Sequence, residues 1–185
     1  GMMPGTEPQW VGIDNYTKLF SSKDFGTAVV NTGFYILGLL PFSVIIPMAL
    51  ANVTNNMKGK AKNIYRALFF LPMIMAGVST ATIFRWLFNP GTGLINVILM
   101  NLGITDTSIA FFTQASAAKW MILLITGWKM IGFSTVIFSA ALTSVDRNYY
   151  EAASLDGSSK TRQFFDFTIF LISPTILFMI MMSIL

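Results

Sequence analysis

The stretch TAVVNTGFYILGLLPFSVIIPMALANV, residues 27–53, decides the fold of this chain because it contains no ionised side chain. About 20 consecutive apolar residues suffice for a helix to cross the hydrocarbon core of a bilayer. Residues 27–53 therefore predict a membrane span. Pro41 lies in the middle of the stretch and predicts a kink, where neighbouring helices must satisfy the carbonyl group that the proline leaves free.

Three further apolar stretches, with one or two charged residues each, are also long enough to cross a bilayer, at residues 64–88, 119–143 and 164–185. Pro72 lies near the start of the first and Pro174 lies within the last, and such prolines form either moving hinges or static kinks. Together, the four stretches predict an all-α fold, a polytopic transmembrane helix bundle with about four spans.

Composition indicates a membrane protein and excludes several other classes. Hydrophobic residues make up 54% of the chain and charged residues 11%, whereas soluble domains carry about 25% charged residues. Neither Cys nor His occurs, which excludes disulfides, thiolate or imidazole catalysis and the usual zinc or haem ligand sets. The sequence also lacks a phosphate-binding P-loop and a basic run with interleaved aromatic residues. We therefore expect no catalysis, no bound cofactor and no nucleic-acid partner.

The distribution of charge predicts the orientation of the spans. Segments 55–66 and 144–163 together carry seven Lys and Arg residues, and the positive-inside rule places such loops in the cytoplasm. The N-terminal segment 1–26 carries two, and it is expected to lie outside as a surface or interfacial segment. The predicted cytoplasmic cations are Lys58, Lys60, Lys62, Arg66, Arg147, Lys160 and Arg162.

Shorter features lie toward the outer side. The apolar pattern of residues 94–99 predicts a short amphipathic helix along the outer surface. Arg85, near the outer end of the second stretch, is expected to be an interfacial anchor. Because the chain opens outside the membrane and is still apolar at Leu185, we expect at least one more helix before Gly1 and one after Leu185 in the complete protein.

The segment 144–163 is the most informative polar region. Residues 149–155 favour a helix, because Glu, Ala and Leu lose little on adopting helical backbone angles. The Asp156-Gly157 pair then breaks that helix, since Gly readily takes a positive φ. Ser158 or Ser159 is expected to cap a second helix. Segment 144–163 is thus predicted to form a helix-turn-helix elbow on the cytoplasmic face.

This elbow is expected to be a docking site. Ala152 and Ala153 are small, so another surface could approach them closely, and Glu151 places a charge beside them. A protein that places most of its length in membrane and presents one organised polar loop is expected to dock a partner there. A solvated connection between two helices is the alternative.

At this level of detail the sequence resembles a known family. Glu151-Ala152-Ala153, Asp156-Gly157 and Phe164, followed by an apolar run containing Pro174, resemble the EAA loop of the permease subunits of binding-protein-dependent ABC importers. Other segments resemble the maltose-type, carbohydrate-uptake branch of that family, so that the resemblance covers nearly the whole chain. These segments are Trp10 to Tyr16, Asn31-Thr32, Phe69 to Pro72, Trp86 to Pro90, Gly93, Asn96, Trp128 and Gly132.

The resemblance implies a six-span permease subunit in a bacterial plasma membrane, of which this chain holds the second to the fifth span. It implies ABC ATPase subunits that use ATP, a second permease subunit and an extracytoplasmic solute-binding protein as partners. The short helix of the elbow would insert into a groove of the ATPase. The ATPase-coupling residues would be Glu151, Ala152, Ala153, Asp156 and Gly157. The chain departs from the family pattern at Phe170, where a first proline is common, and at Asp166, where a basic residue is common.

Lys129 lies near the middle of the third stretch, where a cation costs at least about 2.5 kcal/mol unless it faces a cavity or a partner. One interpretation is that Lys129 lines the translocation path together with Trp128. An ion pair with an acidic residue elsewhere in the complex, or a side chain that snorkels to the membrane surface, explains it equally well.

The sequence therefore favours a permease that supplies half of a gated path for a sugar or a related polar solute, while ATP is hydrolysed in separate subunits. An ATP-independent secondary transporter or channel is the main alternative, with Lys129 as an ion-linked or proton-linked site. In a third interpretation, a membrane scaffold, Lys129 and the prolines would be freely replaceable.

Overall fold

The computed structural model describes residues 10–185, with every side chain except that of Ala61. These residues form helices and connecting turns, and no strand occurs in this part of the chain. The chain divides into two compact units, residues 1–37 and 38–185. In the first unit, α1 (Asp14–Phe20) precedes α2 (Lys23–Leu40). The expected surface segment 1–26 thus contains α1, while its residues 1–9 lie outside the described residues.

The first predicted span is part of a long helical run. Helix α2 continues through one π-helical turn, η1 (Pro41–Ile45), into α3 (Ile46–Asn56). The run Lys23–Asn56 has 34 residues and is long and apolar enough to cross a membrane. The π turn begins at Pro41, which has no N–H to donate, and backbone bonding resumes with Ile46 N–H donating to the Pro41 carbonyl. The irregularity predicted at Pro41 is thus a π turn.

The second predicted span, residues 64–88, contains two helices. Helix α4 (Lys60–Ile74) and helix α5 (Gly77–Leu87) meet at an angle of 97°. Pro72 lies in the last turn of α4, where its ring removes one backbone donor from the helix. Met75 and Ala76 then adopt extended angles, with ψ of 127° and 142°, so the chain leaves α4 in a new direction.

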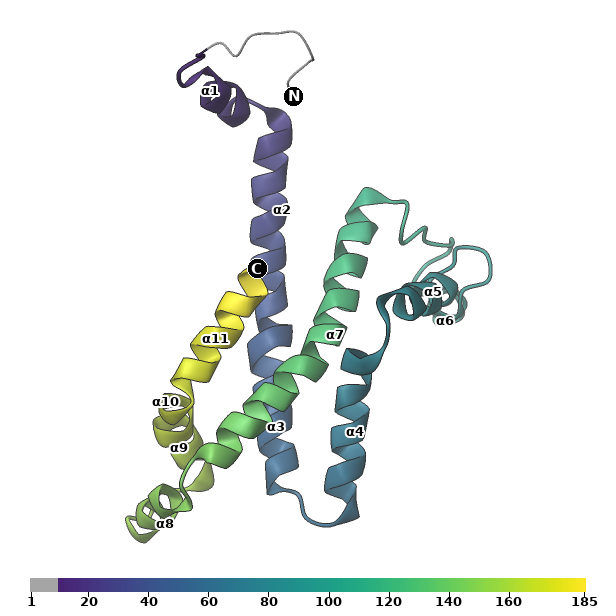
Figure 1. The fold of residues 1–185 in the computed structure, drawn as a ribbon. Helices are drawn as coiled ribbons and strands as arrows, with labels where there is room; N and C mark the ends of the chain where they lie inside the picture. Colours follow the sequence, from purple (N-terminus) through teal and green to yellow (C-terminus); the bar gives the residue numbers. More distant parts are fainter. Residues whose placement is uncertain (1–9) are drawn as a thin grey trace. The chain divides into compact units, whose positions relative to one another are not determined.

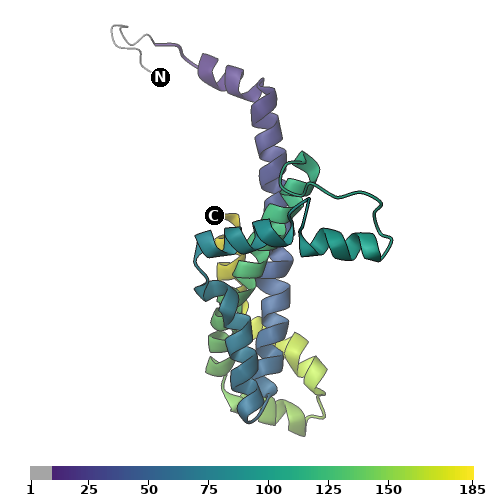
Figure 2. The same cartoon turned by 90° about the vertical axis from the view of Figure 1, so that its right-hand side faces the viewer.

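The third predicted span, residues 119–143, lies within one helix of 30 residues, α7 (Ala115–Ser144). Helices α3 and α4 both pack along α7, as Figures 1 and 2 show from two directions. The backbones of α7 and α4 approach closely at Gly132, where a Cβ atom would lie 3.0 Å from the Phe69 carbonyl oxygen. A side chain at this position would press α4 away by a few tenths of an ångström, so Gly132 favours the close approach of the two helices.

The last predicted span, residues 164–185, contains a bend. Helix α9 (Lys160–Gln163), the π turn η2 (Phe164–Thr168) and α10 (Ile169–Leu171) form one run, and α11 (Ser173–Ile184) follows at a bend of 68°. Pro174 occupies the first turn of α11, where a missing N–H is tolerated. The bend therefore falls at the residues that precede the proline.

The core of the second unit lies where α3, α7 and the bend before α11 meet. Four fully or almost fully buried side chains form it: Ala51, Phe138, Ile172 and Met179. Among the described residues, two helices are long and apolar enough to cross a membrane by themselves. If each bent pair is counted as one span, the number rises to four. The predicted fold class, an all-α membrane helix bundle, is confirmed.

Polar segments gather at the two ends of the second unit. Helix α6 (Leu94–Asn101) contains the short helix predicted at residues 94–99. Figures 1 and 2 place α5 and α6 toward one end of this unit, and the α3–α4 loop and the elbow that contains α8 (Arg147–Leu155) toward the other. The two loops that share a positive charge excess therefore lie at the same end.

Candidate functional site

The elbow at residues 144–163 begins with a capped helix. Helix α8 starts at Arg147, two residues earlier than residues 149–155 predict, because Asp146 acts as its N-cap. The Asp146 Oδ1 atom accepts a hydrogen bond from the backbone N–H of Asn148 at 3.0 Å. An Asp in this position stabilises a helix by about 1 kcal/mol and favours its first turn.

The turn predicted at Asp156-Gly157 ends α8 with a Schellman motif. Gly157 has a φ of +77°, the left-handed conformation that glycine adopts without steric cost. Its N–H donates to the Ser154 carbonyl at 3.1 Å, and the Ser158 N–H donates to the Ala153 carbonyl at 3.0 Å. The predicted role of Gly157 as helix terminator is confirmed by these angles and bonds.

The second helix of the elbow begins directly after the turn. Ser159, rather than Ser158, caps α9, and its Oγ atom accepts a hydrogen bond from the Arg162 N–H at 3.3 Å. The Ser158 hydroxyl is buried and has no partner among the described residues. Only one of the two predicted serine caps is therefore used.

The five residues predicted to couple to an ATPase differ in exposure. Glu151, Ala152, Asp156 and Gly157 are exposed on α8 and its turn, whereas Ala153 is buried with 6% exposure. Ala153 therefore packs against this chain, and the other four are open to a partner. Leu155, which was not predicted as a site residue, is 91% exposed and adds an apolar group to the same helix.

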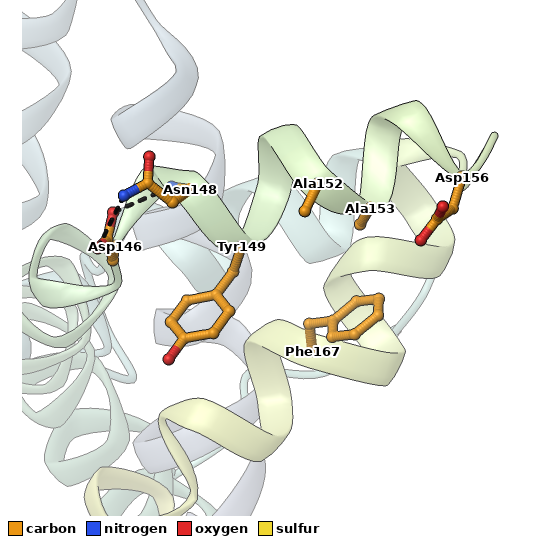
Figure 3. Close-up of a pocket in the computed structure, with 7 residues that line it drawn as sticks. All are labelled: Asp146, Asn148, Tyr149, Ala152, Ala153, Asp156 and Phe167. Carbon is orange, nitrogen blue, oxygen red and sulfur yellow. Dashed lines mark hydrogen bonds between the residues drawn. The ribbon is translucent and has the colours of Figure 1, made fainter.

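A shallow cavity of about 440 Å³ lies between α8 and the last helical run. Figure 3 shows Phe167 of η2 pointing toward α8 below Ala153, with Tyr149 and Asp146 farther along. The cavity means that apolar packing between α8 and η2 is incomplete. Its lining residues are Asp146, Asn148, Tyr149, Ala152, Ala153, Asp156 and Phe167.

Two polar contacts join α8 and its turn to the last helical run, which begins with α9, and sequence reasoning missed both. Gln163 is buried, and its Nε2 atom donates to the Ser154 Oγ atom at 2.9 Å and to the Ser158 carbonyl at 3.1 Å. The Tyr150 hydroxyl lies 2.9 Å from the Thr168 Oγ1 atom. The only sequence signal was an uncharged amide placed at the start of an apolar stretch.

Trp128 and Lys129 lie elsewhere, on α7. The Trp128 ring makes an edge-to-face contact with the Phe84 ring of α5, with 5.5 Å between their centroids. Lys129 is half-buried, and among residues 10–185 the one side-chain ion pair joins Arg162 to Asp166 instead. Lys129 precedes the end of α7 at Ser144 by 15 residues, or about 22 Å of helix. The structure therefore does not bring these two residues into the elbow.

Comparison with known proteins extends this picture. The chain is 33% identical over 180 residues to the probable ABC transporter permease protein YesP of Bacillus subtilis (strain 168), a match that covers 96% of this chain and 57% of that protein. It is 30% identical over 167 residues to the lactose transport system permease protein LacF of Rhizobium radiobacter, covering 90% and 56%. A solved bacterial ABC transporter involved in the import of the acidic polysaccharide alginate matches with a TM-score of 0.81 and 27% identity, covering 94% of this chain and 60% of that one.

The apolar helices long enough to cross a membrane and the capped polar elbow define a helical membrane protein. Residues 43–185 match the family of binding-protein-dependent transport system inner membrane components, and the chain belongs to that family. The resemblance stated from the sequence is thus confirmed, as is the placement in the inner membrane. The chain spans less than two thirds of the length of the relatives named above.

Proposed function

We propose that this chain forms part of a permease subunit of a bacterial ABC importer, and that the solute is a sugar or a related polar compound. Family membership supports the transport role. Relatives named for the transport of lactose, arabinooligosaccharides and sn-glycerol-3-phosphate support the solute class. The chain itself carries no nucleotide-binding P-loop, so ATP would act in partner subunits.

The partners proposed are ABC ATPase subunits, a second permease subunit and an extracytoplasmic solute-binding protein. The family description itself names a binding protein. A related alginate transporter, solved in complex with an alginate pentasaccharide-bound periplasmic protein, supports the solute-binding protein as a partner. Each of these three partners is proposed separately and is tested separately.

The exposed face of α8 carries the proposal for the ATPase. Among the residues of α8, only Ala153 is buried and Tyr150 half-buried, so Glu151 and Leu155 are exposed, and Ala152 is exposed at the edge of the shallow cavity. A short capped helix of this kind offers a rigid surface whose contacts can differ between two nucleotide states. Glu151 would pair with a basic group of the ATPase, and Ala152 would allow close approach.

Lys129 and Trp128 are proposed to line the translocation path. Lys129 is half-buried on α7 without an ion pair among the described residues, and a cation at membrane depth is expected to face water, solute or a partner. Lys129→Gln is expected to lower solute uptake without changing contact with the ATPase. Unchanged uptake would assign Lys129 a structural role instead.

The absence of native Cys allows a direct test of the ATPase contact. In the full-length protein, Ala152→Cys is expected to crosslink to a Cys in the groove of its ATPase, with a yield that changes on ATP addition. Ala152 suits this test because it is exposed, whereas Ala153 is not. Thr113→Cys, exposed beside the other end of α7, is the matched control and should give no crosslink. A folded, inserted protein without a crosslink at Ala152→Cys would favour an ATP-independent transporter.

A further inference from the structure

The joint between α8 and the last helical run contains a point at which the chain could pivot. Gly157 is exposed, has no side chain, and an added Cβ atom would meet nothing within 4 Å. Backbone bonds hold the turn itself, but they do not fix α8 against the helices that follow α9. A movement imposed on α8 would be absorbed at Gly157 unless other contacts cross the turn.

Gln163 supplies the first contact across this turn. Its side chain is only 7% exposed, and both hydrogens of its amide nitrogen are used, by the Ser154 hydroxyl and the Ser158 carbonyl. The Ser154 hydroxyl donates its own hydrogen to the Tyr150 carbonyl at 2.7 Å, so it must accept from Gln163. The donors and acceptors therefore form a directed chain from α9 into α8.

Thr168 supplies the second contact. It is 3% exposed, and its hydroxyl donates to the backbone carbonyl of Gln163 at 3.3 Å. The Tyr150 hydroxyl therefore acts as the donor in its 2.9 Å contact with Thr168. Tyr150 and Ser154, four residues apart on one face of α8, thus meet Gln163 and Thr168, five residues apart on the last run.

The π turn η2 makes this match possible. In an α-helix of 3.6 residues per turn, residues five apart point about 140° away from each other. The i to i+5 bonding of a π turn brings such residues to the same side, and the Ile169 N–H donates to the Phe164 carbonyl in this pattern. Gln163 and Thr168 can therefore both face α8.

The path continues from Thr168 to the core. The Ile172 N–H donates to the Thr168 carbonyl at 3.0 Å, and the Ile172 side chain is 2% exposed in the cluster that contains Phe138 and Met179. Ile172 also precedes the 68° bend into α11. On the side of the cavity, by contrast, packing between α8 and Phe167 is incomplete. The polar contacts thus connect α8 to the core on the side of the last helical run, while Val145, packed against the same core, connects it on the side of α7.

We propose that Gln163 and Thr168, with Tyr150 and Ser154, form a polar latch that makes α8 and the last helical run move as one body, so that displacement of α8 reaches the bend at Ile172. These are positioning residues, and the inference rests on the proposed contact between α8 and an ATPase. Without the latch, α8 would dock but pivot at Gly157.

The test compares docking with transmission in the full-length protein assembled with its partner subunits in proteoliposomes. Gln163→Met keeps the length of the side chain and removes the amide. Docking is read by the ATP-dependent crosslink at Ala152→Cys, and transmission is read by the ATP-dependent change in maleimide labelling of Ser173→Cys, an exposed residue beside the bend. We expect Gln163→Met to retain the crosslink and to lose the change in labelling. Uptake should fall by about 5- to 150-fold, the range of factors by which coupling between two sites typically changes affinity.

The neighbouring Arg162→Gln is the matched control, since Arg162 is exposed and pairs only with exposed Asp166. It should behave as the parent in both readouts. Tyr150→Phe, which removes one hydroxyl, should weaken the labelling change in the same direction if Gln163→Met does not accumulate in the membrane. A labelling change and uptake equal to those of the parent in either variant would overturn the latch and leave docking intact. A parent protein without any crosslink would instead overturn the proposed function, and the latch with it.

Discussion

Helices α6 and α8 end in the same way and are held in different ways. Both end in a Schellman motif with a glycine in the left-handed conformation, Gly103 at a φ of +68° and Gly157 at +77°. In α6 the Ile104 N–H donates to the Leu99 carbonyl at 3.0 Å, which matches the bond from Ser158 to Ala153 in α8. The local turn is therefore the same at both ends of the second unit.

The two regions differ in the hydrogen bonds that a buried side-chain amide makes, Asn96 in α6 and Gln163 in α9. Asn96 is 2% exposed and bonds only backbone atoms: the carbonyls of Asn89 and Ile109, at 3.2 and 3.1 Å, and the Ile109 N–H at 2.9 Å. Gln163 instead donates from its amide to the Ser154 side chain of α8 as well as to the Ser158 and Tyr150 carbonyls, and its backbone carbonyl accepts from Thr168. An amide that bonds both its ends to the backbone holds a loop in one conformation. An amide that joins two helices can pass a displacement between them.

The largest expected effect on stability comes from Asn96→Leu. The substitution leaves the carbonyl and the N–H of half-buried Ile109 without their Asn96 partner, whereas the exposed Asn89 carbonyl still accepts from the Gly93 N–H. A buried group left unsatisfied costs about 1–3 kcal/mol. We expect a clear fall in the midpoint of thermal unfolding in detergent, while the folded fraction keeps its ATP-dependent labelling at Ser173→Cys. If Asn96→Leu removed that labelling response at unchanged stability, the contrast between the two amides would be wrong.

The two glycines provide a more even comparison. Gly103→Ala and Gly157→Ala each place a side chain at a positive φ, with nothing within 4 Å of the added Cβ atom. Each should therefore cost about 1 kcal/mol from the backbone alone, with similar losses in thermal stability. Only Gly157→Ala should lower uptake, because only that turn lies within the latch, between Ser154 and Gln163. Equal losses of uptake in both variants would contradict a special role for the elbow.

The smallest effect is expected for the Arg162–Asp166 pair. Its atoms are 3.1 Å apart, but the two side chains are 74% and 51% exposed, so solvent screens the attraction. Exposed pairs of this type contribute about 0.2–1 kcal/mol. Asp166→Asn should shift the unfolding midpoint only slightly, and less at high salt. A large shift at both salt concentrations would indicate a further contact of Asp166 in the assembled protein.

Local chemistry made the elbow predictable. Residues 149–155 favour a helix by composition, and the Asp156-Gly157 pair terminates it by a backbone rule that needs no tertiary contact. The two-residue shift in the start of α8 has the same origin, since Asp146 is a recognisable cap. Gln163 could not be predicted in this way, because its role depends on partners up to 13 residues away across a turn.

Three prolines show where sequence reasoning fails for the membrane helices. Pro41 begins a π turn within a run that still passes as one span, whereas Pro72 precedes a break of 97° and Pro174 follows one of 68°. The missing N–H is identical in each case. The outcome depends on what surrounds the proline, such as the close contact of α4 with α7 at Gly132. The prolines in the sequence predicted the positions of all three irregularities but not the bend angles between the helices that flank them.

The π turn η2 also constrains the length of the chain. It contains one residue more than an α-helical turn would need to reach the same point. Deleting a single residue from Phe164–Thr168 is therefore expected to leave an α-helical turn that reaches the same point, with Ile172 still in the core. Inserting a second extra residue would instead turn every later side chain by about 100° relative to α8. Relatives of this chain are therefore expected to lose one residue from η2 more readily than to gain one.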